Sequence, residues 1–297
     1  MTTTAELLTR VGHDYLLGGG RERRNVLKTS INSSATTIEL TYELKGIAEG
    51  SVISIDLESM YVVDVNAGAQ TATVQRSESG TPPTAHTAGT AVNVNPRYQP
   101  GIILRQLNAE LDALSAEGLY QMKQTTLTYT SGVDGYDLGD SSAIDVWDVR
   151  ADTPGSEKDW PFVPFTWQNG LPTTGTHAFA SGVAVFPDWG EPGRSLRVWY
   201  KAPFSHLSSA SDVVETTAGI HTEAVDLLCI GAAVRMVAGH AVRRARPDAQ
   251  GDTRRGEEVT VNDSLQSVRA LLALRDTRLK AEIGRLRRMY PARLRTR

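Results

Sequence analysis

Residues 221–242, HTEAVDLLCIGAAVRMVAGHAV, place apolar side chains around most of the circumference of a helix. A helix with this pattern is buried on nearly every side. Its small residues, such as Gly231, Ala232 and Ala233, permit neighbouring helices to approach closely. We predict that residues 220–246 form this helix and that it belongs to the helical core of the protein.

A second long helix is predicted over residues 263–290, with Asp263 as its N-cap and Pro291 as its stop. This helix is one-sided, and arginines such as Arg275 and Arg285 are expected on the faces away from its apolar stripe. The stripe consists of Leu265, Val268, Leu272, Leu279, Ile283, Leu286 and Tyr290.

The charge of the chain is unevenly distributed. The whole sequence has a formal net charge of −3, whereas residues 243–297 hold 15 Lys or Arg and 7 Asp or Glu, a local charge of +8. Residues 1–242 therefore carry the difference, −11. A basic end of this kind favours an acidic protein surface or nucleic acid as its partner.

Two β-rich regions precede the C-terminal helices. Residues 28–96 contain short alternating segments separated by glycines, such as TTIELTYEL at 36–44, and predict a small barrel-like module. Residues 124–204 predict a sandwich-like antiparallel module that includes a hairpin turning at Asp134 and Gly135. The predicted fold class is α+β, with a helical bundle core formed by the long C-terminal helices and two antiparallel β modules.

These patterns divide the chain into five parts. A short amphipathic helix begins the chain, and another helix, expected to end at Gly118, separates the two β modules. The parts are the N-terminal helix with a glycine hinge (1–27), the barrel-like module (28–96), the middle helix (97–123), the sandwich-like module (124–204) and the C-terminal helical region with its basic tail (205–297).

No catalytic or metal-binding pattern is recognisable in the sequence. There is no phosphate loop, no nucleophile elbow and no metal-binding histidine spacing, and the one cysteine, Cys229, lies in an apolar run. The acidic residues Asp134, Asp137, Asp140 and Asp145 are expected to be turn residues rather than calcium ligands. We therefore expect no enzyme activity, no cofactor and no metal, and folding in a reducing cytoplasm. The longest apolar run is too short to cross a bilayer, and we expect neither a signal peptide nor a membrane partner.

Two stretches resemble parts of phage structural proteins. Residues 249–291, AQGDTRRGEEVTVNDSLQSVRALLALRDTRLKAEIGRLRRMYP, look like the end of head-to-tail adaptor (connector or neck) proteins of tailed double-stranded DNA bacteriophages. Residues 72–98, ATVQRSESGTPPTAHTAGTAVNVNPRY, are similar to a β module that recurs in phage structural proteins. The resemblance spans most of the chain and rests on the order of these features rather than on a catalytic signature.

The resemblance implies a structural virion protein that is synthesised in the host cytoplasm and located at the neck of the virion. It implies a homo-oligomeric ring, commonly a dodecamer, between the portal protein and downstream head-completion, stopper or tail proteins. Double-stranded DNA would pass through the channel of this ring and contact it in passing.

Two sets of residues are expected to serve this assembly. The predicted ring-packing residues are Leu227, Leu228, Val234, Val237, Leu272, Leu279, Ile283 and Leu286. The predicted portal-docking residues are Arg287, Arg288, Tyr290, Arg293, Arg295 and Arg297. Deletion of residues 291–297 is expected to weaken attachment to the portal.

Two other functions are compatible with the sequence. A tail or baseplate protein with carbohydrate- or receptor-binding β modules would expose Trp160, Trp167 and Trp189, whereas structural tryptophans would fill a core or an intersubunit seam. A hydrolase whose catalytic carboxylates are distant in the sequence would leave no local pattern.

Overall fold

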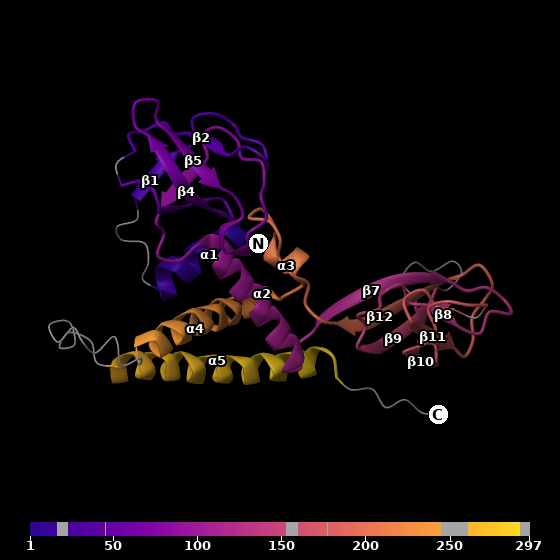
Figure 1. Ribbon diagram of the computed structural model, residues 1–297. Coiled ribbons are helices and arrows are strands. Elements are labelled where there is room, and N and C mark those ends of the chain that lie inside the picture. The colour runs from indigo at the N-terminus through magenta and orange to yellow at the C-terminus, as the bar shows by residue number, and fades with distance from the viewer. Residues whose placement is uncertain (17–22, 45, 153–159, 177, 245–260, 292–297) are drawn as a thin grey trace. The chain divides into compact units, whose positions relative to one another are not determined.

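A computed structural model of the protein describes residues 1–16, 23–44, 46–152, 160–176, 178–244 and 261–291 (Figure 1). The chain is mixed α/β and forms two compact units. Unit 1 comprises residues 1–111 and 206–280, and unit 2 comprises residues 112–205 and 281–297. The expected combination of α-helices with antiparallel sheets is confirmed, whereas the expected helical bundle core is not confirmed.

Unit 1 contains a six-stranded antiparallel sheet that curls into a half-barrel (Figure 1). In spatial order its strands are β1 (Arg23–Val26), β6 (Ala91–Val94), β3 (Val52–Ile55), β4 (Glu58–Asn66), β5 (Thr71–Gln75) and β2 (Thr37–Glu39). An antiparallel bridge between Leu27 and Leu40 joins the ends of the two edge strands. Strand β1 lies outside the predicted β module, which begins at residue 28. The sequence did not indicate this strand, because its residues RRNV show no apolar alternation.

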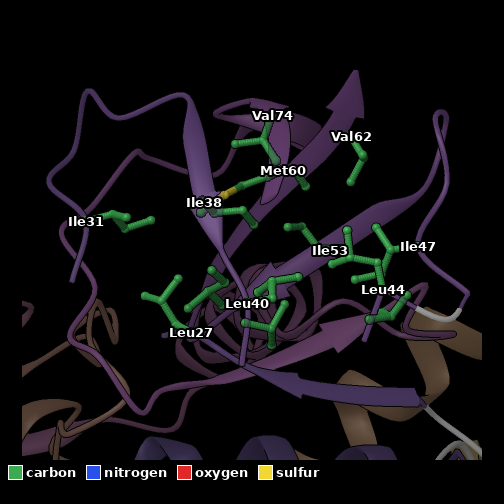
Figure 2. Close-up of a cluster of buried hydrophobic side chains, with 14 residues drawn as sticks. Leu27, Ile31, Ile38, Leu40, Leu44, Ile47, Ile53, Met60, Val62 and Val74 are labelled. Atoms are coloured by element: carbon green, nitrogen blue, oxygen red, sulfur yellow. The ribbon is translucent and has the colours of Figure 1, made fainter. Parts of the chain in front are cut away.

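One face of the curled sheet forms an apolar core (Figure 2). Alternate residues of each strand point into this core, and Ile53 and Ile55 of β3 and Met60 and Val62 of β4 are fully buried there. The cluster consists of Leu27, Ile31, Ile38, Leu40, Leu44, Ile47, Ile53, Ile55, Met60, Val62, Ala72, Val74, Val92 and Val94. Tyr42 continues the alternation of residues 36–44 in the sequence but is 60% exposed, because strand β2 ends at Glu39.

The N-terminal helix α1 (Thr4–Arg10) begins with a capping box. The Thr3 hydroxyl accepts a hydrogen bond from the Glu6 N–H at 3.3 Å, and the Glu6 carboxylate accepts one from the Thr3 N–H at 2.8 Å. A π-helical turn (Val11–Tyr15) extends α1. The resulting segment agrees with the short amphipathic helix predicted at the start of the chain.

Helix α2 (Pro100–Ala116) ends at the predicted glycine. Gly118 has φ +95°, and its N–H bonds to the Ser115 carbonyl at 3.2 Å, while the Leu119 N–H bonds to the Leu114 carbonyl at 3.0 Å. These two bonds form a Schellman motif, which requires a left-handed residue that glycine adopts without strain.

The C-terminal helices differ from their predictions mainly at their starts. After the short helix α3 (Val214–Thr217), a 3₁₀ turn (Thr222–Ala224) precedes helix α4 (Val225–Arg244). Helix α5 (Val261–Met289) begins before Asp263, so the prediction of Asp263 as N-cap is wrong. It ends just before Pro291, as predicted, because proline cannot continue the helical hydrogen bonds.

Unit 2 contains two three-stranded antiparallel sheets. The first has the order β7 (Gln121–Thr128), β12 (Ser195–Ala202) and β9 (Asp145–Ala151), and the second has β10 (Phe165–Asn169), β11 (Val183–Pro187) and β8 (Tyr136–Asp137). Both sheets contribute to one apolar cluster, to which β12 supplies Leu196, Val198 and Tyr200 and β11 supplies Val183 and Val185. Two sheets that share one core form the sandwich-like arrangement expected for this region.

The hairpin predicted at Asp134 and Gly135 is wrong, because β7 pairs with β12 and β8 pairs with β11. Gly135 serves close packing instead. A Cβ atom at this position would lie 2.6 Å from the ring of Phe186 and 3.0 Å from that of Phe179. Gly135 is therefore explained by contact with aromatic rings rather than by a tight turn between paired strands.

Candidate assembly site on the C-terminal helices

A single buried carboxylate joins three helices of unit 1. Glu110 of α2 is 1% exposed, and its Oε2 accepts a hydrogen bond from Arg235 Nε of α4 at 2.9 Å. Its Oε1 accepts one from Arg275 Nε of α5 at 2.6 Å. We call these three residues the Glu110 clamp. A buried carboxylate is tolerated only when it is paired, so the clamp holds the three helices in one arrangement.

Two members of the clamp, Glu110 and Arg275, are recognisable in the sequence as charged residues at apolar positions of their helices. Glu110 lies three residues after Leu107 and four before Leu114, which places it on the buried face of α2. Arg275 lies in the same way between Leu272 and Leu279 on α5. The expectation that Arg275 faces away from the apolar stripe is wrong, since this residue is 8% exposed. A charge inside an apolar stripe predicts a buried partner.

Gly231 of α4 makes room for the clamp. A Cβ atom on Gly231 would lie 2.1 Å from Cδ of Glu110 and 2.3 Å from its Oε1. No ordinary side chain fits at that distance unless Glu110 moves. The prediction that small residues of α4 permit a close approach is confirmed at this position.

Replacing Gly231 with alanine is expected to lower the free energy of unfolding by about 1–3 kcal/mol, because the added methyl group overpacks the clamp. Gly284→Ala in α5 is the matched control, since a Cβ atom there meets no atom within 4 Å. The control should gain up to about 1 kcal/mol from the higher helix propensity of alanine. Urea denaturation measures both variants, and equal stability of the two would contradict the close approach.

A second ion pair lies near the start of α4 in unit 1. Arg278 donates from Nε to Asp226 Oδ2 at 3.0 Å and from a terminal nitrogen to Oδ1 at 2.9 Å, and it also donates to the Glu223 carbonyl at 3.0 Å. The Arg278 side chain is 43% exposed, and exposed pairs contribute only about 0–1 kcal/mol. The buried Glu110 clamp is therefore the stronger constraint on these helices.

Most of the predicted ring-packing residues are buried within their own chain. The buried ones are Leu227, Leu228, Val234, Leu279 and Leu286. Val237 and Ile283 are half-buried, and Leu272 is 40% exposed. Leu274, which the sequence pattern did not single out, is 47% exposed. Because a side chain buried in one chain stabilises that chain, the large apolar side chains that the described part of α5 offers to another molecule are those of Leu272, Leu274 and, at its end, Met289.

The predicted portal-docking residues fall into three groups. Tyr290 packs within unit 2, where its ring lies edge-on to Trp147 with centroids 5.4 Å apart, and Trp147 Nε1 donates to the Pro291 carbonyl at 3.2 Å. Arg287 and Arg288 are exposed. Arg293, Arg295 and Arg297 lie outside the described residues.

The three tryptophans that a carbohydrate-binding surface would use differ in their exposure. Trp189 is 44% exposed. Trp160 is half-buried, and the Arg197 guanidinium lies 3.8 Å from its ring centroid and so covers a face that a sugar ring would stack on. Trp167 is half-buried and packs against the apolar cluster of unit 2.

Two of the acidic residues considered as calcium ligands are engaged in turns. The Asp137 carboxylate accepts hydrogen bonds from the Gly139 N–H at 2.8 Å and from the Ser181 hydroxyl. Burial alone would raise the pKa of Asp140, but hydrogen bonds from Ser142, Lys123 and Tyr200 outweigh it and lower this pKa to about 2. Within the described residues, no group of three His, Cys, Asp or Glu side chains could hold a metal ion. Of the helices that the structure describes, none is long and apolar enough to span a bilayer.

No family model matches this sequence, and no curated protein shows significant similarity to it.

Proposed function

We propose that this chain is a structural virion protein of a tailed bacteriophage, a head-to-tail adaptor. Copies of it form a ring, expected to be a dodecamer, between the portal protein and downstream neck or tail proteins, and DNA passes through the channel. The observation that carries the proposal is the Glu110 clamp, which fixes α2, α4 and α5 of unit 1 while apolar side chains of α5 stay exposed. A structural role of this kind needs no catalytic residues.

The exposed leucines of α5 support a ring rather than a symmetric dimer. Leu272 and Leu274 are two positions apart, so they project about 200° apart around the helix. They therefore flank the buried face that contains Arg275 and Leu279, one on each side. A closed ring uses a heterologous interface, in which one surface of each copy meets a different surface of the next. Two separate apolar flanks on one helix fit that requirement.

The basic end of the chain supports docking on the portal. Arg287 and Arg288 are exposed at the end of α5, while Tyr290 and the Pro291 carbonyl anchor that end within unit 2. Guanidinium groups held in this way are suited to carboxylates of an acidic partner surface. We propose that these arginines, together with Arg293, Arg295 and Arg297, bind the portal.

Truncation after Pro291 is expected to weaken portal attachment at least about 10-fold, since loss of about 1.4 kcal/mol suffices for that factor. This truncation keeps the carbonyl that accepts from Trp147, so unit 2 should retain its fold. A full-length variant with Arg293, Arg295 and Arg297 replaced by serine distinguishes the effect of lost charge from the effect of a shorter chain. The control for a change in net charge elsewhere is Arg105→Glu, at an exposed position on α2. Co-sedimentation with purified portal measures attachment. Unchanged attachment of both tail variants would refute the docking role.

A further inference from the structure

Unit 1 contains a buried charge cluster that ring formation does not require. The side chains of Glu58 and His86 are 0% and 1% exposed, and that of Arg76 is 8% exposed. Arg76 donates from Nε to Glu58 Oε1 and from a terminal nitrogen to Oε2, both at 2.6 Å. Its remaining N–H groups donate to the carbonyls of Asn32, Ala35 and Thr84.

Both ring nitrogens of His86 face carboxylates. Nδ1 lies 2.8 Å from Asp56 Oδ2, and Nε2 lies 3.1 Å from Glu58 Oε2. A neutral imidazole carries one N–H and can donate to only one of them, whereas an imidazolium donates to both. With His86 protonated, its charge and that of Arg76 balance the charges of Asp56 and Glu58. The Thr84 hydroxyl is the alternative partner of Nε2, but at 3.4 Å it is farther away than the carboxylate.

The cluster fastens the segment from Thr84 to His86 to the sheet. The Thr84 N–H donates to Glu58 Oε2 at 2.9 Å. The backbone of His86 pairs with Ile31 through two hydrogen bonds of 2.9 Å each. The loop that contains the exposed prolines Pro82 and Pro83 is therefore held to the β module at its C-terminal end, through both the backbone and the ring of His86.

We propose that His86 is a protonation latch: its imidazolium donates to both Asp56 and Glu58 and so ties residues 84–86 to them, and loss of the proton removes one of these two hydrogen bonds and loosens the segment. Asp56 gives the latch access to water, since its side chain is 49% exposed and borders a cavity of about 230 Å³ that His13 and Arg24 also line. The charged groups that face His86 are Asp56 from the β3–β4 connection and Glu58 from the start of β4, and Arg76 reaches the cluster from the end of β5.

The expected pH window follows from the direction of each shift. Burial alone would lower the pKa of His86, but hydrogen bonds from its ring to Asp56 and Glu58 raise it above the ordinary 6.5. Its stabilising contribution is therefore complete below 6.5 and is lost as the pH rises through the raised pKa. Burial alone would raise the pKa of Glu58, but hydrogen bonds from Arg76, Thr84 and His86 lower it below 4.5, so its contribution is lost only in stronger acid.

Two measurements on the full chain test the latch. Titration of the ¹³C-labelled histidine ring by NMR should give a pKa above 6.5 for His86. Hydrogen exchange at pH about 5.5 and about 8.5, corrected for intrinsic rates, should show protection of residues 84–88 falling about 10-fold at the higher pH, the factor expected for loss of one hydrogen bond between charged groups. Peptides from β3 and β4 provide the internal reference.

Variants distinguish the latch from a merely structural histidine. His86→Gln keeps one donor but cannot titrate, so its loop protection should not depend on pH over this range. Should that variant fail to fold, Asp56→Asn still tests the idea, because removing this charge should lower the pKa of His86. A His86 pKa at or below 6.5, or loop protection that does not change with pH in the unmodified chain, would overturn the proposal.

Discussion

Replacing Glu110 with glutamine is expected to destabilise unit 1 by about 3–5 kcal/mol, the usual cost of breaking a buried ion pair. The amide of glutamine has no charge, so Arg275, which is 8% exposed, loses its buried counter-charge, whereas its other acidic neighbour, Asp276 at 3.8 Å, is exposed. Urea denaturation followed by helical circular dichroism measures the loss. All five tryptophans lie in unit 2, so their fluorescence follows that unit separately in the same samples.

Two further variants make this experiment decisive. Glu49→Gln removes an exposed carboxylate in the β module and should change the stability by less than about 0.5 kcal/mol. Glu110→Met combined with Arg275→Met replaces the buried pair by apolar side chains and should recover most of the loss, because Arg235 is 36% exposed and can be solvated. If Glu110→Gln unfolds at the same urea concentration as the unmodified chain, the clamp does not hold the helices.

Charge at either exposed leucine of α5 is expected to prevent ring closure. Leu272→Glu or Leu274→Glu removes apolar area and places a carboxylate in the proposed interface, which should weaken association by at least about 10-fold. Because the two residues flank α5 on different sides, each variant loses a different half of a heterologous interface. A mixture of the two should therefore form dimers through the one intact combination of surfaces, and no closed rings.

Analytical ultracentrifugation of each variant and of the mixture measures this outcome. Glu substitution at Thr277, an exposed residue of the same helix, is the control and should leave assembly unchanged. Rings formed by Leu272→Glu and Leu274→Glu at the concentration that suffices for the unmodified chain would exclude these flanks as the interface. A mixture that behaves like each variant alone would show that the interface is not heterologous.

Elements that rest on local periodicity were predictable from the sequence. Strands β9, β11 and β12 and helix α2 lie where alternation or helical spacing predicts them, and Gly118 ends α2 as expected. The pairing of strands was not predictable from local pattern. The partner of β7 is β12, far along the chain, and the Asp-Gly pair at 134–135 suggested a nearer partner.

The candidate site was predicted only in part. The apolar stripe of α5 correctly located a long helix, but it could not distinguish leucines buried in the same chain from those left exposed, because both have the same spacing. The Glu110 clamp needed three segments far apart in the sequence to meet, and no local pattern encodes that meeting. The segment from Arg76 to His86 belongs to the stretch at 72–98 that resembles a phage β module. Its partners lie elsewhere, Asp56 in the β3–β4 connection and Glu58 at the start of β4, and no local pattern links them to this segment.

The central proposal, a ring that docks on a portal, is tested most directly by cryo-electron microscopy of the purified chain, alone and mixed with portal protein. We expect closed rings, or rings that form on the portal, whose symmetry can be counted and in which α5 of each copy contacts its neighbours. A monodisperse monomer that ignores the portal at every concentration tested would contradict the proposed function.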